Sequence, residues 1–349
     1  MIRARGDEKS QYGERSTLEL LGLFEPDCKP KRGLPRAIPA GVSQAQRQFP
    51  RPLLGSGRMD YVGRIFRPPS EARSLLLQVS VGCSHNRCGY CDMYRDKRFT
   101  IKPWEVVERD IQIAKQMGPR FEKLFLCDGD ALILPTKRLL QILETVQREL
   151  PWIERVGVYG DTRSVGRKSV EELTALREAG LGIVYHGFES GDDEVLRLID
   201  KGGTRAECID TAAKLRSAGV AHSVMVLLGV GGEELSERHA KHTASLLTEM
   251  DPAYAGALTT TLVPGTPLFD AAQRGEFRLP GKFRMLQELR TIVAESQFSA
   301  CRFSSNHASN YLPIRSELPR DRDEVVRILD EVIARADERL LKPEALRGL

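Results

Sequence analysis

From residue 74 onward, short apolar runs alternate with longer stretches in which apolar and polar positions repeat with helical spacing. Buried parallel strands take the form of continuous apolar runs, because helices cover the sheet. The apolar runs are 75–81, 123–126, 155–159, 182–188, 222–229 and 255–263, and the helical stretches lie near 103–117, 136–149, 168–179, 204–218 and 234–249.

Six strand-then-helix units in series predict an α/β fold with a parallel sheet, either doubly wound or curled into a partial barrel. We expect this core to span residues 74–300. Two further helical stretches follow Pro264, and a cap of residues 301–349 completes the chain with a polar segment at 302–311 and a charged helix from about 320 to 340.

Residues 1–73 have a different composition from the core. They contain eight of the 19 prolines, and 14 Lys and Arg against eight Asp and Glu. Proline fixes φ and lacks an amide donor, so long regular elements are not expected here. We interpret this region as a basic, proline-rich extension with a short helix near 16–24 and an extended arm; a solvated tail is the alternative.

Composition narrows the class of protein. The 349 residues are 41% hydrophobic and 29% charged, as in ordinary soluble domains. The net charge of +4 is too small to indicate nucleic-acid binding by itself. No apolar run reaches the roughly 18 residues of a membrane span, and no apolar stretch typical of a secretion signal follows the N-terminus. We therefore expect a cytoplasmic protein without a membrane partner.

Three of the seven cysteines lie within nine positions, at Cys83, Cys88 and Cys91, directly after the first predicted strand. In parallel α/β folds, sites are built from the loops at the carboxyl ends of the strands. Thiolates suit zinc or iron–sulfur clusters. Without a fourth cysteine nearby, a cluster keeps one iron open for a ligand. A zinc knuckle completed by His85 is the alternative.

The segment from Gly82 to Cys91 resembles the cluster loop of the radical S-adenosylmethionine (SAM) superfamily, whose spacing is CxxxCxxC with an aromatic residue before the third cysteine. Tyr90 takes the aromatic place, and four residues instead of three separate Cys83 from Cys88. Further segments resemble the elongator, methylthiotransferase and coproporphyrinogen oxidase branch. They are 187–191 (Gly-Phe-Glu-Ser-Gly) with Lys201-Gly202, 225–233 and 264–268. Segment 125–130, after the second strand, resembles the Gly-Gly-Glu-like segment of the superfamily as a whole through Gly129 and an acidic residue.

This resemblance implies a partial (β/α)6 barrel like that of TIM, with the N-terminal extension and the C-terminal cap attached. It implies a [4Fe–4S] cluster on the three cysteines, and SAM bound to the open iron. An external donor of the flavodoxin or ferredoxin type would supply the electron that splits SAM into methionine and a 5′-deoxyadenosyl radical. The residues implied in SAM binding are Gly129, Asp130, Glu189, Ser190, Gly229 and Gly231.

The substrate side is less specific in the sequence. Tyr159 and Arg163 follow the third strand, and Asn306, His307 and Asn310 lie in the polar segment. We expect these five side chains to contact the substrate, because loops after the strands face the barrel mouth. A small-molecule substrate is favoured over tRNA, since no RNA-binding module is visible. An iron–sulfur electron carrier and a zinc-stabilised binding protein remain as alternatives outside the enzyme class.

Overall fold

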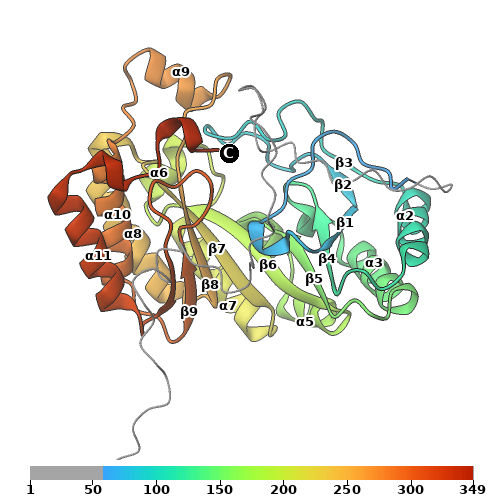
Figure 1. Ribbon diagram of the computed structural model, residues 1–349. Coiled ribbons are helices and arrows are strands. Elements are labelled where there is room, and N and C mark those ends of the chain that lie inside the picture. The colour runs from blue at the N-terminus through green and yellow to red at the C-terminus, as the bar shows by residue number, and fades with distance from the viewer. Residues whose placement is uncertain (1–57, 349) are drawn as a thin grey trace, which may run out of the picture.

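A curved, mostly parallel sheet forms the centre of the computed structural model, which describes residues 58–348 (Figure 1). The expected helix near 16–24 and Cys28 lie outside the described residues. The strands of this sheet are β1 (Leu75–Gln78), β4 (Lys123–Cys127), β5 (Arg155–Tyr159), β6 (Leu181–Glu189), β7 (Ala221–Leu228), β8 (Tyr254–Thr259), β9 (Cys301–Ser304) and β10 (Arg315–Leu318).

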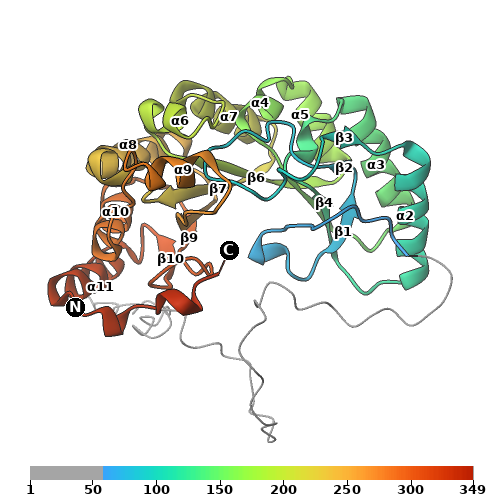
Figure 2. The same cartoon turned by 90° about the horizontal axis from the view of Figure 1, so that it is seen from above.

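Within the described range the sheet has eight strands, in the order β1-β4-β5-β6-β7-β8-β9-β10. Neighbouring strands are parallel from β1 to β9, and only β10 is antiparallel to its neighbour. Beside it, β2 (Ser80–Val81) and β3 (Thr100–Ile101) form an antiparallel pair. Seen from above, the sheet is an arc with helices along its convex side (Figure 2). The expected α/β fold of the partial-barrel type is confirmed.

The structure adds two strands that the hydrophobic pattern does not predict, β9 and β10. Each has four residues, and each alternates buried positions with charged ones: Arg302 in β9, and Arg315 and Glu317 in β10. A four-residue strand with charges on one face has no apolar run, so the segment reads as a polar cap. The polar segment at 302–311 therefore begins within β9 and continues as a loop after Ser304.

The helices match the sequence pattern closely, and two of them begin with capping boxes, Ser169 with Glu172 and Thr204 with Glu207. The last long helix is shorter than expected and ends at Ala336, which takes a left-handed conformation. The helices are α2 (Trp104–Met117), α3 (Thr136–Glu149), α4 (Thr162–Gly166), α5 (Val170–Glu178), α6 (Asp193–Leu198), α7 (Arg205–Ser217), α8 (Gly232–Met250), α9 (Pro267–Gln273), α10 (Lys282–Glu295) and α11 (Arg322–Arg335). Short 3-10 turns are η2 (Pro69–Glu71), η3 (Ala131–Ile133), η4 (Glu338–Leu340) and η5 (Glu344–Leu346).

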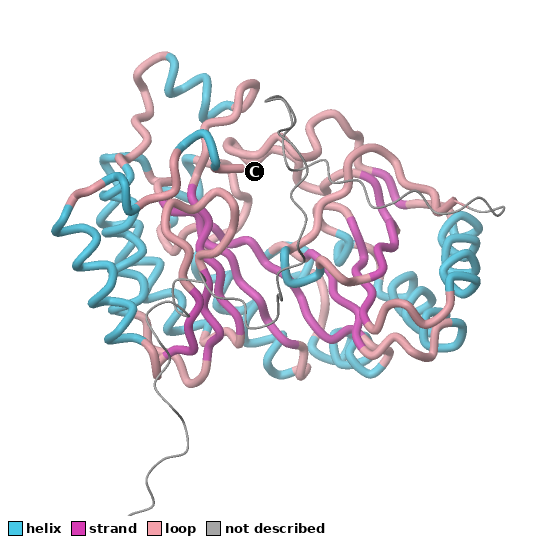
Figure 3. Tube along the Cα trace, viewed as in Figure 1, coloured by secondary structure: helices cyan, strands magenta, loops and turns pink. Residues whose placement is uncertain are grey.

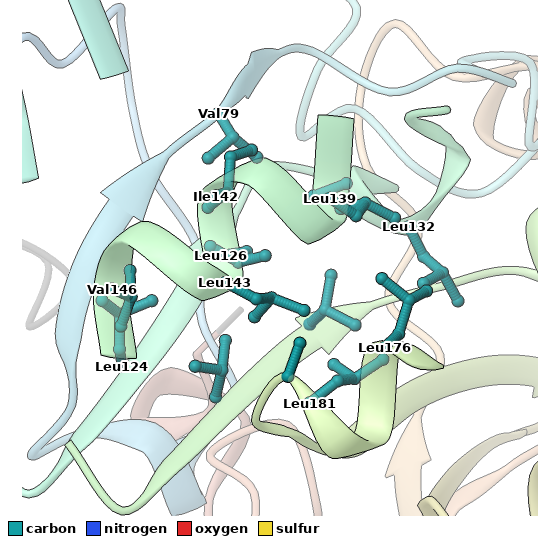
Figure 4. Packing of buried hydrophobic residues seen from close by; sticks show 14 of the residues in the cluster. Val79, Leu124, Leu126, Leu132, Leu139, Ile142, Leu143, Val146, Leu176 and Leu181 are labelled. Atoms are coloured by element: carbon teal, nitrogen blue, oxygen red, sulfur yellow. The ribbon is translucent and has the colours of Figure 1, made fainter. Parts of the chain in front are cut away.

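Helix and loop segments cover the arc from outside, as the tube trace shows (Figure 3). Under α2, α3 and α5, buried side chains such as Leu126, Ile142 and Leu176 form one apolar cluster (Figure 4). A second cluster lies under α8, α10 and α11. Among the described residues, no helix has the length and apolar character needed to cross a bilayer.

The concave face differs from one end of the sheet to the other. Over β4, β5 and β6 it is filled by Phe125, Tyr159 and Tyr185, whose rings meet edge to face with centroids 5.0–6.3 Å apart. Below them, the buried Glu71 of η2 accepts a hydrogen bond from Tyr185 and pairs with Arg155. These side chains fill the concave face over β4, β5 and β6, and the loops at the carboxyl ends of the strands carry the candidate site.

Candidate active site

The three neighbouring cysteines lie in one loop, residues 82–91, which follows β1 and β2 and which we call the cysteine loop. The thiols of Cys83, Cys88 and Cys91 are half-buried and free of disulfides. Burial raises the pKa of each thiol, for Cys91 to about 11, while the ammonium of Lys201 acts in the opposite direction on all three. Soft thiols gathered near one cation suit a cluster that binds thiolates.

The fit to a cluster differs from the fit to a single ion. No group of three or more His, Cys, Asp or Glu side chains within residues 58–348 is arranged to hold one metal ion. A [4Fe–4S] cluster binds each cysteine through a different iron, so its thiolates need not converge on one centre. Three thiols on one short loop therefore fit the cluster, and leave its fourth iron for another ligand.

The segment after β4 supports the start of the cysteine loop. Asp128, in a left-handed conformation, accepts a hydrogen bond of 2.6 Å from the amide of Gly82. Gly129 donates its own amide to the carbonyl of Gly82 at 3.2 Å. A Cβ at Gly129 would lie 2.7 Å from the Cβ of Cys83 and 2.9 Å from the ring of Tyr94. The chain needs a glycine here because the cysteine loop packs directly on its backbone.

The other end of the cysteine loop is held from two sides. The amide of Gly89 donates to the carbonyl of Ile199 at 2.7 Å, just after α6. The carbonyl of Gly89 accepts from the amide of Leu268 at 2.9 Å, in the first turn of α9. These contacts explain why the segments near 201 and 264–268 accompany the cysteine motif in the sequence: both lie against the loop.

Asp130 lies beside the cysteine loop and is completely buried. Its carboxylate accepts from the hydroxyl of Ser84 at 2.5 Å and from the amide of Asp161 at 3.3 Å. Burial and the nearby Asp161 carboxylate raise the pKa of Asp130 to about 7. Arg163 pairs with Asp161, which also caps α4 by accepting from Ser164. Arg163 is thus connected to Asp130 through Asp161.

Glu189 lies at the carboxyl end of β6, where the register with β7 shifts. Its φ of +68° is in the left-handed region, so the bulge turns the side chain toward the cysteine loop. The carboxylate accepts from the hydroxyl of Tyr90 at 2.8 Å and from the ammonium of Lys201 at 3.0 Å. Glu189, Tyr90 and Lys201 form a buried polar group next to the thiols.

Lys201 is the cation of this group, and 15% of its side chain is exposed. Burial alone would lower the pKa of its ammonium, but the neighbouring Tyr90, Glu189 and Cys88 raise it well above its usual range. Sequence analysis noted Lys201 within a motif but did not select it as a site residue. A Lys-Gly pair after a helix does not by itself indicate a functional site. Only the folded chain shows that Lys201 lies near the three thiols.

Ser190 follows Glu189 but faces away from the thiols. It is completely buried, and its hydroxyl lies 2.8 Å from Nδ1 of His239 in α8. The same oxygen accepts from the amide of Asp192 at 3.1 Å. Ser190 therefore connects the end of β6 to the outer helical layer.

Gly229 and Gly231 follow β7 and lead into α8. Gly229 has a φ of +81°, and its amide donates to the carboxylate of Glu288 at 2.6 Å. A Cβ at Gly229 would lie 2.8 Å from the sulfur of Met285. The close approach of α10 thus explains the glycine at 229.

Tyr159 is the last residue of β5 and is partly buried. It belongs to the aromatic cluster on the concave face, with Phe125 on one side. The structure therefore brings the cysteines, Gly129, Asp130 and Glu189 together at the carboxyl ends of the strands and places Tyr159 in the aromatic cluster.

The polar loop, residues 305–311, lies on the β8–β9 side of the arc. The side chain of Asn310 is buried, and its amide nitrogen donates to the carbonyls of Ala257 and Ser305, each at 2.8 Å. Its oxygen accepts from the hydroxyl of Thr259 at 2.8 Å. Both ends of the Asn310 amide are thus used to join the loop to β8.

The other two residues expected to contact substrate in this loop are less buried. Nδ1 of His307 lies 2.9 Å from the hydroxyl of Ser309. With its amide turned so that the oxygen faces Arg315, which is the orientation that satisfies both side chains, Asn306 accepts from the Arg315 guanidinium at 2.8 and 2.9 Å. His307 and Asn306 therefore have local partners within or next to the loop.

Comparison with known proteins gives the same class as the cysteine loop. The family model of the radical SAM superfamily matches residues 77–247. The heme chaperone HemW of Bacillus subtilis (strain 168) is 21% identical over 57% of this chain and 53% of HemW. Biotin synthase of Caulobacter sp. (strain K31) is 26% identical over 66% of each chain. The structure of the radical SAM methyltransferase TsrM from Kitasatospora setae aligns with a TM-score of 0.49 at 20% identity, over 60% of this chain and 41% of that chain.

The chain belongs to the radical SAM superfamily. The cofactors of this superfamily are a [4Fe–4S] cluster and SAM. The chain spans about half the length of HemW and about two thirds of the length of biotin synthase.

Proposed function

We propose that this protein is a radical SAM enzyme that acts on a small molecule. The observation that carries the proposal is the arrangement at the rim of the arc: three thiols on one loop, next to Lys201 and Glu189. Cys83, Cys88 and Cys91 would hold a [4Fe–4S] cluster there, and the bound cluster would supply the electron for reductive cleavage of SAM and the radical chemistry on the substrate.

The residues around the loop match the charges of SAM. Lys201 is a cation that suits the SAM carboxylate, since charge-assisted hydrogen bonds are the strong ones. Glu189 and Asp130 are buried carboxylates that suit the ammonium and the ribose hydroxyls. We infer that Glu189 exchanges part of its contact with Tyr90 and Lys201 for contact with SAM, which keeps each buried charge paired.

Backbone groups complete the proposed SAM site. Gly229 and Gly231 flank Val230 in the turn at the end of β7, and the two positions without a side chain would let a planar adenine approach the backbone. Gly129 keeps the cysteine loop close to the rim. Ser190 contributes from outside the barrel, through its contact with His239.

The substrate would lie on the concave face below SAM. Met225 and Gly256 are register partners in β7 and β8 and are only partly buried there, unlike Phe125 and Cys127 in β4. Tyr159 borders this region. We propose that Tyr159, Arg163 and the residues of the polar loop meet the substrate, and that the reducing electron comes from an external donor of the flavodoxin or ferredoxin type.

The test is anaerobic reconstitution with iron and sulfide, followed by incubation with SAM and dithionite. We expect about four irons and four sulfides per chain, because one three-thiolate site is present among the described residues, together with formation of 5′-deoxyadenosine and methionine. A stable cluster without SAM cleavage would favour an electron carrier. Bound zinc without acid-labile sulfide would favour a zinc-stabilised binding protein.

A further inference from the structure

Two ionisable side chains are buried in the outer helical layer behind the rim, at positions that the proposed chemistry does not use. His239 of α8 is fully buried, and Glu288 of α10 is 2% exposed. Both lie among apolar residues packed between α8, α10 and the sheet. A buried acid and a buried histidine cost folding free energy unless they are paired, so their presence needs a reason.

Glu288 makes its contact with the loop after β7. One of its carboxylate oxygens, Oε2, accepts the amide of Gly229 at 2.6 Å. Gly229 has a φ of +81°, and the sulfur of Met285 would lie 2.8 Å from a Cβ at this position, so α10 packs closely on the turn. The carboxylate of Glu288 thus fixes the first residue of the glycine turn.

His239 makes its contact with the loop after β6. The hydroxyl of Ser190 accepts from the amide of Asp192, so its own hydrogen is free to be donated to Nδ1 of His239 at 2.8 Å. Burial lowers the pKa of His239 to about 4, which leaves the ring neutral with its hydrogen on Nε2. That Nε2 lies 3.9 Å from Oε2 of Glu288.

The four groups therefore lie in one row, Ser190–His239–Glu288–Gly229, that runs through two helices outside the barrel. Its two outer contacts are hydrogen bonds, whereas His239 and Glu288 lie near each other at its centre without a hydrogen bond. We propose that His239 and Glu288 are positioning residues that hold the loops after β6 and β7 in register for SAM. The inference rests on the proposed function, since it assigns the two loops to SAM binding. Neither side chain touches SAM; each acts through the backbone or hydroxyl that it holds.

The separation of the two loops explains why such a row is needed. β6 and β7 are neighbours, but a bulge between Gly187 and Glu189 shifts their register, and the last paired residues are Glu189 and Val226. Beyond this pair, the loops that contain Ser190 and Gly229 are held from behind by side chains of α8 and α10.

The test compares Glu288→Ala with Glu288→Gln in reconstituted enzyme. Glu288→Ala removes the acceptor of the Gly229 amide, and we expect the dissociation constant and the KM for SAM to rise about tenfold. The kcat at saturating SAM should change less than about threefold, and iron content should stay unchanged. Glu288→Gln retains an oxygen for the amide and should restore most of the SAM affinity.

A matched control separates positioning from general loss of packing. Leu289→Ala, the next residue of α10, is equally buried but contacts the apolar cluster, and we expect it to lower the melting temperature without raising the KM for SAM. If Glu288→Ala does not fold, His239→Leu breaks the row at its centre and should raise the KM in the same direction. Unchanged SAM binding in the folded variants would overturn the inference, whereas wild-type enzyme that binds no SAM would overturn the proposed function instead.

Discussion

The cysteine loop and the polar loop both follow a strand at its carboxyl end, but they use their polar groups in opposite ways. In the cysteine loop the backbone is held from outside, by Asp128, Ile199 and Leu268, and the thiols are left available. In the polar loop the side chains make the supporting contacts: both the nitrogen and the oxygen of the Asn310 amide are hydrogen-bonded, to Ala257, Ser305 and Thr259.

The chemistry of the side chains explains this difference. Asn, Ser and His hydrogen-bond readily to nearby backbone, so a loop rich in them can be satisfied by itself. A thiol is a weak hydrogen-bond donor, so three thiols in one loop are better explained by reactivity or metal binding than by support of the backbone. Clustered cysteines therefore indicate ligand binding more strongly than clustered amides and hydroxyls do.

The strongest way to test the comparison is to remove all three thiols. In Cys83→Ala, Cys88→Ala, Cys91→Ala, we expect complete loss of the brown chromophore and of SAM cleavage, because no other three-cysteine group is present among the described residues. Iron and sulfide analysis after anaerobic reconstitution measures the effect. The matched control is Cys208→Ala, a buried cysteine on α7, which should keep its cluster. Iron retained by the triple variant would disprove the site.

The second test changes the support of the cysteine loop and leaves the thiols intact. Gly129→Ala would place a methyl group 2.7 Å from the Cβ of Cys83, and we expect it to lower cluster content by more than half. Gly166→Ala is the control, since a Cβ there meets nothing within 4 Å. Equal iron content in the two variants would show that the cysteine loop adapts and is not held rigidly.

Sequence reasoning finds the cysteine loop and the sheet from β1 to β8 because both have local signals. Apolar runs identify the buried strands, and Cys83, Cys88 and Cys91 identify themselves by spacing. The hydrophobic pattern does not predict β9 and β10, because each is four residues long and charged on one face. The fold class could be predicted in full, and the number of strands could not.

The residues behind the site show more clearly what cannot be predicted from the sequence. The roles of Lys201, His239 and Glu288 depend on contacts with residues that are 12 to 59 positions away along the chain. The local pattern around Glu288 is that of an amphipathic helix, in which one glutamate on the apolar face is the only signal. Long-range contacts of this kind are set by packing, which periodicity does not encode.

The third test asks whether the polar loop is structural. Asn310→Ala removes three buried hydrogen bonds and leaves the partners in β8 unpaired. We expect the free energy of unfolding to fall by about 2–4 kcal/mol, measured by urea denaturation. Asn310→Asp keeps the acceptor for Thr259 and loses the donors, so it should also destabilise. A fall below about 1 kcal/mol would mean that these bonds are replaced by water.

The fourth test concerns the carboxylate beside the cysteine loop. Glu189→Ala should weaken SAM binding about tenfold or more, which corresponds to about 1.5–3 kcal/mol for a charge-assisted hydrogen bond, while cluster content stays intact. Equilibrium dialysis of reconstituted protein measures the affinity. Glu234→Ala, an exposed glutamate at the start of α8, is the control. Unchanged SAM affinity in a folded Glu189→Ala variant would remove Glu189 from the proposed site.

The last test has the smallest expected effect on stability, and it separates support of the fold from contact with substrate within the polar loop. His307 has one side-chain partner within its own loop, Ser309, so His307→Ala should cost no more than about 1.5 kcal/mol of unfolding free energy. Cluster content and the slow cleavage of SAM without substrate should persist.

We expect the dialysable small-molecule fraction of a cell extract to accelerate SAM cleavage by the wild type but not by His307→Ala, because a contact with substrate is lost while the loop remains folded. Ser299→Ala, an exposed residue before β9, should respond to the extract like the wild type. Equal acceleration of His307→Ala would assign the whole polar loop to structure, and the cysteine loop would then be the one loop of this pair that binds ligands.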